Sequence, residues 1–585
     1  MRVVLKRRKT RVPQPGEWGW VKRMKVSVPI FIILMGILIF VSHATTVPWN
    51  NNPIDQSVDT LASDTAVTFD NHGEALPALD TYKVATKDAW IDLKRPSTGE
   101  TQRAHVLIRY PKNAGGTDED NANATSKLPG VVFMHGAGYG TADNSFGDVA
   151  EDLSSAGFVT ATVDKPVWST NDITRDYPGS AHAYGQVVDY LRSMDMVDPH
   201  KVGLYATSES TWISPYLVRD DGNIAFQILL SPMVQTPRHA LGFFVAQDFA
   251  IVGANPGYQS IVRRVFSADT AQFGLTNLDF NPMIAEGYAI PTFVAYGSKD
   301  VMTAQVDGVR DIELMAHRSG NWNVTVRNYP VANHVMRLGD EAEEGTPLVD
   351  RYERDMVDWA VGTSRGLQET SASIAGTTIY QSIAVPTNLY GHPKLTVYGV
   401  GVHVAAVITL LIAFVLALIA LERKIRYMIR GQGPALGFVR GYQRVLITIS
   451  ATTLATLLLF FAGIGQIIWR VVTLIWGAAP ESPGMIYWSW YAIQVVCVLV
   501  VWAWSRVFCQ LLETASQKGL LRTPDEWRAD FEIKRLTGKP VLRIRGVHTG
   551  PVVASTRLGV TLFVATTLAM FCVLLVFAFW GLFVY

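Results

Sequence analysis

The chain has 585 residues, which is more than a single hydrophobic core usually holds, so we expect several folded units. Hydrophobic residues make up 49% of it and charged residues only 17%, against roughly 25% in typical soluble domains. The formal net charge of +1 argues against a nucleic-acid-binding protein, which would usually carry a basic face. No Cys/His spacing typical of a zinc site occurs, and we expect neither a metal nor a cofactor.

The first apolar segment, residues 26–43, follows a basic region at 1–25 that we expect to be cytoplasmic. Basic residues before an apolar run are typical of a Sec-type signal or signal anchor. The run is long for a cleavable signal, which favours an uncleaved anchor, whereas the sequence SHA at 42–44 would suit a cleavage site. Both interpretations predict that the residues after it are exported.

Four more apolar segments follow residue 394, and each is close to the about 20 residues that a membrane-spanning helix needs. They are residues 397–421, 445–469, 487–508 and 559–583. Lys and Arg gather in the loops at 422–444 and 510–557, whereas residues 471–486 contain neither. The positive-inside rule then places the two basic loops in the cytoplasm, and the middle of the chain and the C-terminus outside. The sequence predicts a multi-pass plasma-membrane protein, with a four-span domain at 395–585 and the lipid bilayer as its partner.

Three polar residues, His403, Gln466 and Gln494, lie within these spans. They either form hydrogen bonds between helices or line a path for a substrate or an ion. The spans contain no Asp or Glu, which favours an anchor or assembly platform over a pump.

The middle of the chain, residues 80–362, alternates apolar strand-like runs with amphipathic helical stretches. This alternation predicts an α/β domain with a mostly parallel sheet flanked by helices. In such sheets, functional residues gather at the carboxyl ends of the strands. The flanking segments 44–79 and 363–394 lack clear periodicity and are expected to be linkers. Residues 237–289 interrupt the alternation and are expected to form either a helical cap over the site or a plain helical excursion.

The stretch VGLYATSESTWISP, residues 202–215, predicts a strand that turns sharply into a helix with a serine at the corner. A nucleophile on such a turn needs small residues two positions before and two after it. Ser208 meets this need with Ala206 and Ser210, whereas a nucleophile at Ser210 would place Trp212 there. We therefore predict Ser208 as the nucleophile. By itself the pattern fits an ordinary helix N-cap equally well.

Two further side chains follow strand ends in the order that a serine hydrolase needs, Ser then Asp then His. Asp300 follows the strand-like run PTFVAYG, and His334 lies in the loop after the next strand. We predict that Asp300 orients His334 and that His334 is the base for Ser208.

The run FMHGAGYG ends an earlier strand and predicts a flexible turn that can aim main-chain N–H groups at an oxyanion. We predict the Ala137 amide as one donor and the Glu209 amide as the other. His135 and Gly136 are expected to shape this loop.

These stretches resemble the α/β-hydrolase superfamily, and most closely its bacterial dienelactone-hydrolase and prolyl-oligopeptidase-like branch. The resemblance covers residues 80–362 and is carried by VVFMHGAGYGTAD, ATVDKPVWST, KVGLYATSESTWISP with IAFQILLSP, and IPTFVAYGSKD with ANHVMR. The elbow commonly reads G-H-S-x-G-G-W in that branch, and ATSESTW occupies those places here. The resemblance implies nucleophile, acid and base roles for Ser208, Asp300 and His334.

We therefore expect a membrane-anchored extracytoplasmic serine hydrolase that acts on an ester bond, with an amide or peptide bond as the less favoured alternative. Its expected substrate is a cell-envelope lipid or an acylated glycan, an inference from location alone. The alternative is a catalytically degenerate hydrolase fold that serves in binding, assembly or transport.

Overall fold

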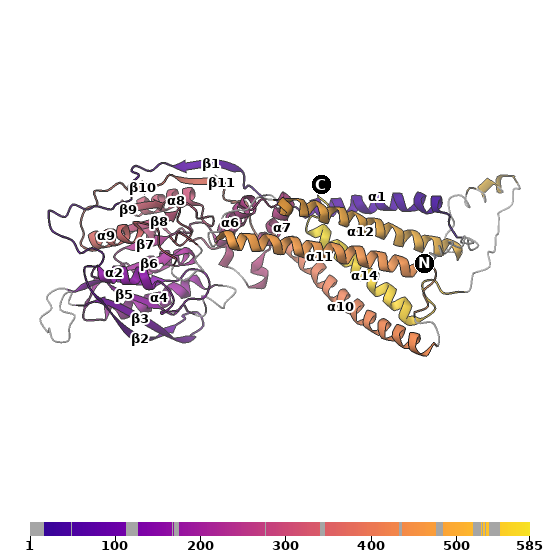
Figure 1. Ribbon diagram of the computed structural model, residues 1–585, viewed down its shortest axis with the longest axis horizontal. Helices are drawn as coiled ribbons and strands as arrows, with labels where there is room; N and C mark the ends of the chain where they lie inside the picture. The colour runs from indigo at the N-terminus through magenta and orange to yellow at the C-terminus, as the bar shows by residue number, and fades with distance from the viewer. Residues whose placement is uncertain are drawn as a thin grey trace, which may run out of the picture.

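The computed structural model describes residues 17–584 apart from 48, 113–126, 167, 169–174, 275–276, 340–345, 432–435, 476–483, 519–527, 529–530, 533 and 537–549. Much of the predicted basic region 1–25 and of the predicted loop 510–557 therefore lies outside the described residues. The molecule is elongated, with a sheet domain at one end and a bundle of long helices at the other (Figure 1).

Nine strands form one sheet in the order β10-β9-β8-β7-β6-β4-β5-β3-β2. They are β2 (Val84–Lys94), β3 (Thr101–Pro111), β4 (Leu128–Met134), β5 (Val159–Val163), β6 (Val197–Thr207), β7 (Gln227–Leu230), β8 (Thr292–Gly297), β9 (Val324–Tyr329) and β10 (Ile374–Gly376). Only β3 runs antiparallel to its neighbours β2 and β5, and every other pair is parallel. The prediction of an α/β domain with a mostly parallel sheet is confirmed.

Two separate cores lie on the two faces of this sheet. Along β4, Val132 and Met134 belong to one core and Val131 and Phe133 to the other, because side chains alternate along a strand. Helices α4 (Tyr177–Arg192), α5 (Ser214–Asp220) and α8 (Gln305–Arg318) cover the first face. Helices α2 (Gly147–Ser155) and α9 (Tyr352–Ser364) cover the second. Burial on both faces explains why β5, β7, β8 and β9 are buried at every residue.

The flanking segments 44–79 and 363–394 differ from the expected linkers. Strand β1 (Pro53–Val58) pairs antiparallel with β11 (Ile379–Ile383), and β10 extends the main sheet beside β9. The two segments also bridge at Ala62 and Ala375. They are thus ordered parts of the sheet domain. Their strands are short, and β1 and β11 pair across more than 300 residues of sequence, so no local pattern indicates them.

Five helices in the described part of the chain are long and apolar enough to cross a membrane. They are α1 (Trp20–Ala44), α10 (Pro393–Arg430), α11 (Tyr442–Ile475), α12 (Gly484–Gln517) and α14 (Arg557–Phe579). Each predicted span falls within or largely within one of them. Their outer faces expose large apolar side chains such as Leu411, Phe461 and Val495, as a bilayer-facing surface does.

Polar contacts hold the helices of the bundle together. Arg23 of α1 forms an ion pair with the buried Glu513 of α12 at 2.8 Å. His403 accepts a hydrogen bond from the Trp580 indole at 2.8 Å, and the Gln494 amide donates to the Val584 carbonyl at 2.8 Å. His403 and Gln494 therefore serve the first of the two roles considered for them, hydrogen bonding between segments of the bundle.

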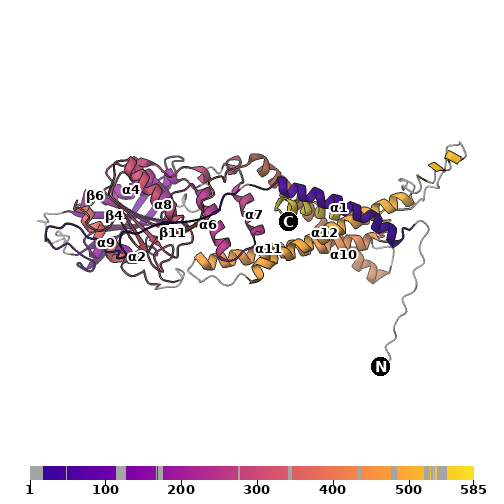
Figure 2. The same ribbon diagram turned by 90° about the horizontal axis from the view of Figure 1, so that it is seen from above.

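The segment 237–289 lies between the sheet and the bundle in both views (Figure 1, Figure 2). Its main helices are α6 (Pro237–Ile251) and α7 (Pro256–Phe266), and short 3₁₀ turns follow at Thr270–Phe273, Asn277–Asp279 and Ala285–Tyr288. The Tyr258 hydroxyl lies 2.8 Å from that of Ser489, and Arg264 donates to the Ser42 carbonyl at 3.1 Å. The segment thus docks the sheet domain onto α1 and α12, which differs from the expected cap over the site.

Candidate active site

The predicted nucleophile Ser208 stands where β6 ends and a 3₁₀ turn (Ser208–Trp212) begins. Its φ is 53°, in the left-handed region that costs an L-residue about 1–2 kcal/mol and that functional turns often hold. Ala206 is fully buried in the strand, and the Ser210 hydroxyl donates to the Met134 carbonyl at 2.8 Å. A serine two positions after the nucleophile therefore fits this turn and ties it to the end of β4.

The three residues predicted as nucleophile, base and acid form one hydrogen-bonded chain. His334 Nε2 lies 2.9 Å from Ser208 Oγ, and His334 Nδ1 lies 3.0 Å from Asp300 Oδ1. All three are buried. These distances fit a base that hydrogen-bonds both its nucleophile and the carboxylate that orients it.

The environment of Asp300 keeps its carboxylate charged. Burial by itself raises the pKa, but the His334 ring and hydrogen bonds from the Thr303 hydroxyl and the Met302 amide outweigh it. The pKa of Asp300 therefore lies below its ordinary value. An ionised carboxylate at Nδ1 fixes the tautomer of His334 that leaves Nε2 free to accept a proton.

The loop that follows β4 passes directly over the nucleophile. A Cβ atom on Gly136 would lie 3.3 Å from Ser208 Cβ and 3.3 Å from the Thr207 carbonyl oxygen, so a side chain here would push against the nucleophile turn. His135 is buried, and burial lowers its pKa to about 4. The neutral ring bonds to the Val163 carbonyl of β5, which anchors the loop. Ala137, the next residue after Gly136, lines the pocket. Its amide as an oxyanion donor remains a prediction.

A buried ion pair, which the sequence did not indicate, connects this loop to the nucleophile turn. Lys165 Nζ lies 3.0 Å from Glu209 Oε2, and it donates to the carbonyls of Gly136 at 2.6 Å and Gly138 at 3.1 Å. Arg175 also contacts Glu209, at 3.3 Å. Burial lowers the pKa of Lys165, and the Glu209 carboxylate opposes that effect. Lys165 thus ties the two segments that carry the predicted oxyanion donors.

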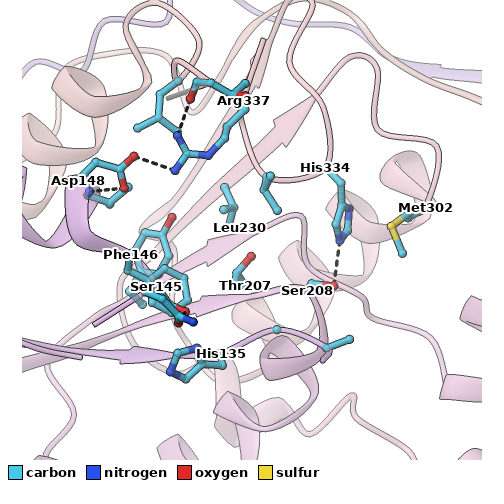
Figure 3. Close-up of a pocket in the computed structure, with 18 of the residues that line it drawn as sticks. His135, Ser145, Phe146, Asp148, Thr207, Ser208, Leu230, Met302, His334 and Arg337 are labelled. Carbon is cyan, nitrogen blue, oxygen red and sulfur yellow. Dashed lines mark hydrogen bonds and ion pairs between the residues drawn. The ribbon is translucent and has the colours of Figure 1, made fainter. Parts of the chain in front are cut away.

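Ser208, His334 and the loop residues His135, Gly136 and Ala137 line a pocket of about 860 Å³. Figure 3 shows Ser208 and His334 on one side and the Arg337–Asp148 ion pair, at 2.7 Å, on the other. The described residues that line it are His135, Gly136, Ala137, Tyr139, Asn144, Ser145, Phe146, Asp148, Val149, Tyr205, Thr207, Ser208, Leu230, Met302, His334, Val335, Arg337, Thr346, Pro347, Leu348, Glu353 and Ile475. None of the described residues of 237–289 is among them. The volume suits a small-molecule substrate. Within the described residues, no cluster of three or more His, Cys, Asp or Glu side chains could hold a metal ion.

Asp248 of α6 is a buried carboxyl outside this pocket. Among the residues that the structure describes, neither of its oxygens has a hydrogen-bond partner. Burial, and secondarily the charge of Asp300, raises its pKa to about 9. The folded protein therefore holds Asp248 protonated at neutral pH.

Replacing Asp248 with Asn is expected to stabilise the protein increasingly as pH rises. The folded pKa is raised, so between about pH 4 and pH 9 the folded state keeps a proton that the unfolded state has lost. The native carboxyl then costs about 1.4 kcal/mol of stability per pH unit, a cost that Asn lacks. Melting temperatures of both proteins between pH 6 and 8.5 measure this, and a difference that stays constant with pH contradicts it.

The chain has the α/β-hydrolase fold. This fold is defined by the order of strands β2 to β9, by the antiparallel strand β3, and by a serine on the turn after β6. The order of serine, acid and histidine along the chain is also that of the fold. The predicted α/β-hydrolase fold is therefore confirmed.

No known family model and no curated protein matches the sequence. Among solved structures, the chain is similar to one described as a dipeptidyl aminopeptidase IV from Bacteroides ovatus, with 11% identity over 48% of this chain and 36% of that one and a TM-score of 0.34. It is also similar to 2,6-dihydroxy-pseudo-oxynicotine hydrolase, with 16% identity, 49% and 71% coverage and a TM-score of 0.32. A thermostable carboxylesterase from a metagenomic library shows 16% identity, 49% and 91% coverage and a TM-score of 0.31. The chain thus spans about a third of the first of these proteins, and the likeness concerns the fold alone.

Proposed function

We propose that this protein is a membrane-anchored serine hydrolase whose preferred substrate is an ester. The observation that carries the proposal is the hydrogen-bonded chain from Ser208 through His334 to Asp300 at the wall of a pocket. The left-handed φ of Ser208 supports it, because an ordinary N-cap has extended backbone and no need for this strain.

In the proposed reaction, His334 Nε2 takes the proton of Ser208 Oγ while Oγ attacks the ester carbonyl carbon. The amides of Ala137 and Glu209 stabilise the oxyanion that forms. The tetrahedral intermediate then expels the alkoxide, which takes the proton from His334 Nε2 and leaves as an alcohol. Water then attacks the acyl-serine while His334 takes its proton; the acid leaves, and Ser208 Oγ regains its proton from His334 Nε2. Asp300 stays ionised throughout and stabilises the imidazolium.

An assay of the purified protein with p-nitrophenyl esters and the matching p-nitroanilides tests this reaction. Ester hydrolysis that exceeds anilide hydrolysis and stops after treatment with a fluorophosphonate supports the proposal. A protein that neither hydrolyses these substrates nor reacts with the fluorophosphonate instead fits the alternative of a binding or assembly protein.

We also propose that the sheet domain is extracytoplasmic, because Lys and Arg gather in the loops that would lie on the opposite side of the membrane. An envelope lipid or an acylated glycan would then be within its reach.

Cysteine labelling measures this sidedness, because the three native cysteines are buried. A Thr98→Cys variant places a thiol on the exposed surface of the sheet domain, and Lys424→Cys places one on the basic side of α10. We expect a membrane-impermeant maleimide to label Thr98→Cys in intact cells and Lys424→Cys only after permeabilisation. The reverse pattern contradicts the proposed topology.

A further inference from the structure

The wall of the pocket includes a residue of a membrane helix. Ile475, the last residue of α11, lines the same pocket as Ser208 and His334. Helix α11 has 34 residues, so it is about 51 Å long, whereas the apolar part of a bilayer is about 30 Å thick. The helix is therefore longer than the apolar part of a bilayer requires, and Figure 1 shows that one of its ends reaches toward the sheet domain.

The edge of the sheet that carries the site faces the bundle. Strands β4 to β9 are parallel, so their carboxyl ends share one edge, and Ser208 follows β6 at that edge. Six residues separate the end of β7 from the start of helix α6, which lies at the same edge and packs against α11. Helix α7 meets α12 so closely that a Cβ atom on Gly257 would lie 2.0 Å from the Trp490 ring. These contacts fix the position of the site relative to the end of the bundle.

Exposed tryptophans indicate where the membrane–water interface lies along the helices. Trp469 on α11 and Trp488 on α12 expose most of their surface, and such tryptophans are typical of the membrane–water interface. Ile475 lies six residues beyond Trp469, which at 1.5 Å per residue is about 9 Å along the helix. The part of the pocket wall that Ile475 forms therefore lies within about 9 Å of the membrane–water interface, measured along α11.

The pocket lining combines apolar and charged surfaces. Its apolar residues include Leu230, Met302, Val335, Leu348 and Ile475. The Arg337–Asp148 ion pair forms the side across from Ser208 (Figure 3). Such a lining suits a molecule with an apolar chain and a polar group.

We propose that the substrate is an amphiphilic ester held in the adjoining leaflet of the bilayer, and that it reaches Ser208 past the end of α11 with its apolar chain against Ile475. This inference rests on the proposed hydrolase function. It specifies how the substrate is presented and which residue contacts its chain.

Proteoliposomes containing the full chain test it with two fluorogenic esters of the same alcohol. Umbelliferyl oleate is supplied within the vesicles and umbelliferyl butyrate in solution. We expect Ile475→Asn to lower kcat/KM for the oleate about tenfold, because an amide replaces apolar contact with the chain, and to change the butyrate rate less than about twofold. Val472→Asn, an exposed position in the same helical turn that does not line the pocket, is the matched control and should leave both rates within about twofold.

The outcomes separate this inference from the proposed function. Hydrolysis of the butyrate by the wild type, together with an unaltered oleate rate in Ile475→Asn, overturns the inference and leaves the hydrolase function standing. An equal loss on both esters in Ile475→Asn also overturns it, because the residue then acts on the site in general. A wild type that hydrolyses neither ester overturns the hydrolase function.

Discussion

Replacing Ser208 with alanine is expected to lower kcat/KM for a p-nitrophenyl ester at least about 10⁴-fold, because the variant has no atom to form the acyl-enzyme. Within the described part of the chain, the Ser208 hydroxyl forms its hydrogen bond with His334, at 2.9 Å. We therefore expect the melting temperature to change little. Steady-state kinetics and thermal unfolding of the same preparation measure both quantities.

Ser210→Ala is the matched control for this variant. Its hydroxyl accepts from the Thr207 amide at 2.8 Å and donates to the Met134 carbonyl, so its loss should reduce stability by about 1–3 kcal/mol. Ester hydrolysis should persist, because Ser208 remains. A Ser210→Ala variant that is inactive beside an active Ser208→Ala variant would contradict the assignment of the nucleophile.

Replacing Lys165 with methionine is the second change with a large expected effect. It leaves the Glu209 carboxylate without its closest cation in a buried site, which should cost about 3–5 kcal/mol of stability. It also releases the carbonyls of Gly136 and Gly138, so the loop that carries the Ala137 amide loses its fixed position. A poorly placed oxyanion donor should lower kcat about 10²- to 10³-fold, with a smaller change in KM.

The double variant Lys165→Met/Glu209→Gln separates these two effects. Removing both charges relieves the unpaired carboxylate, so part of the lost stability should return. The kcat should stay low, because the hydrogen bonds from Lys165 to the loop carbonyls are still missing. A kcat that recovers together with the melting temperature would show that Lys165 stabilises the fold without positioning the loop.

The sequence predicts the arrangement of Ser208, Asp300 and His334 because each follows the end of a recognisable strand. Parallel strands bring their carboxyl ends to one edge, so local patterns are enough to place the three side chains near each other. The elbow lacks the usual glycines, and only the structure shows that Ala206 and Ser210 fit it.

The contacts that the sequence did not predict all join residues far apart in the chain. Lys165 and Glu209 are 44 residues apart, and nothing near either one indicates the other. Strands β1 and β11 pair across an even longer separation, which is why their segments resembled linkers. The docking of α7 on α12 is a contact of the same kind, and it directs the segment 237–289 toward the bundle. The five apolar helices, by contrast, follow from local composition alone.

The most direct test of the central claim is to map the site of fluorophosphonate modification by mass spectrometry on the full chain in isolated membranes. Ser208 lies in the tryptic peptide between Lys201 and Arg219, which also contains Ser210 and Ser214. We expect one phosphonyl adduct, on Ser208, and none after the protein is unfolded before labelling. An unmodified peptide, or an adduct on another serine, would contradict the assignment of Ser208 as the nucleophile of a serine hydrolase.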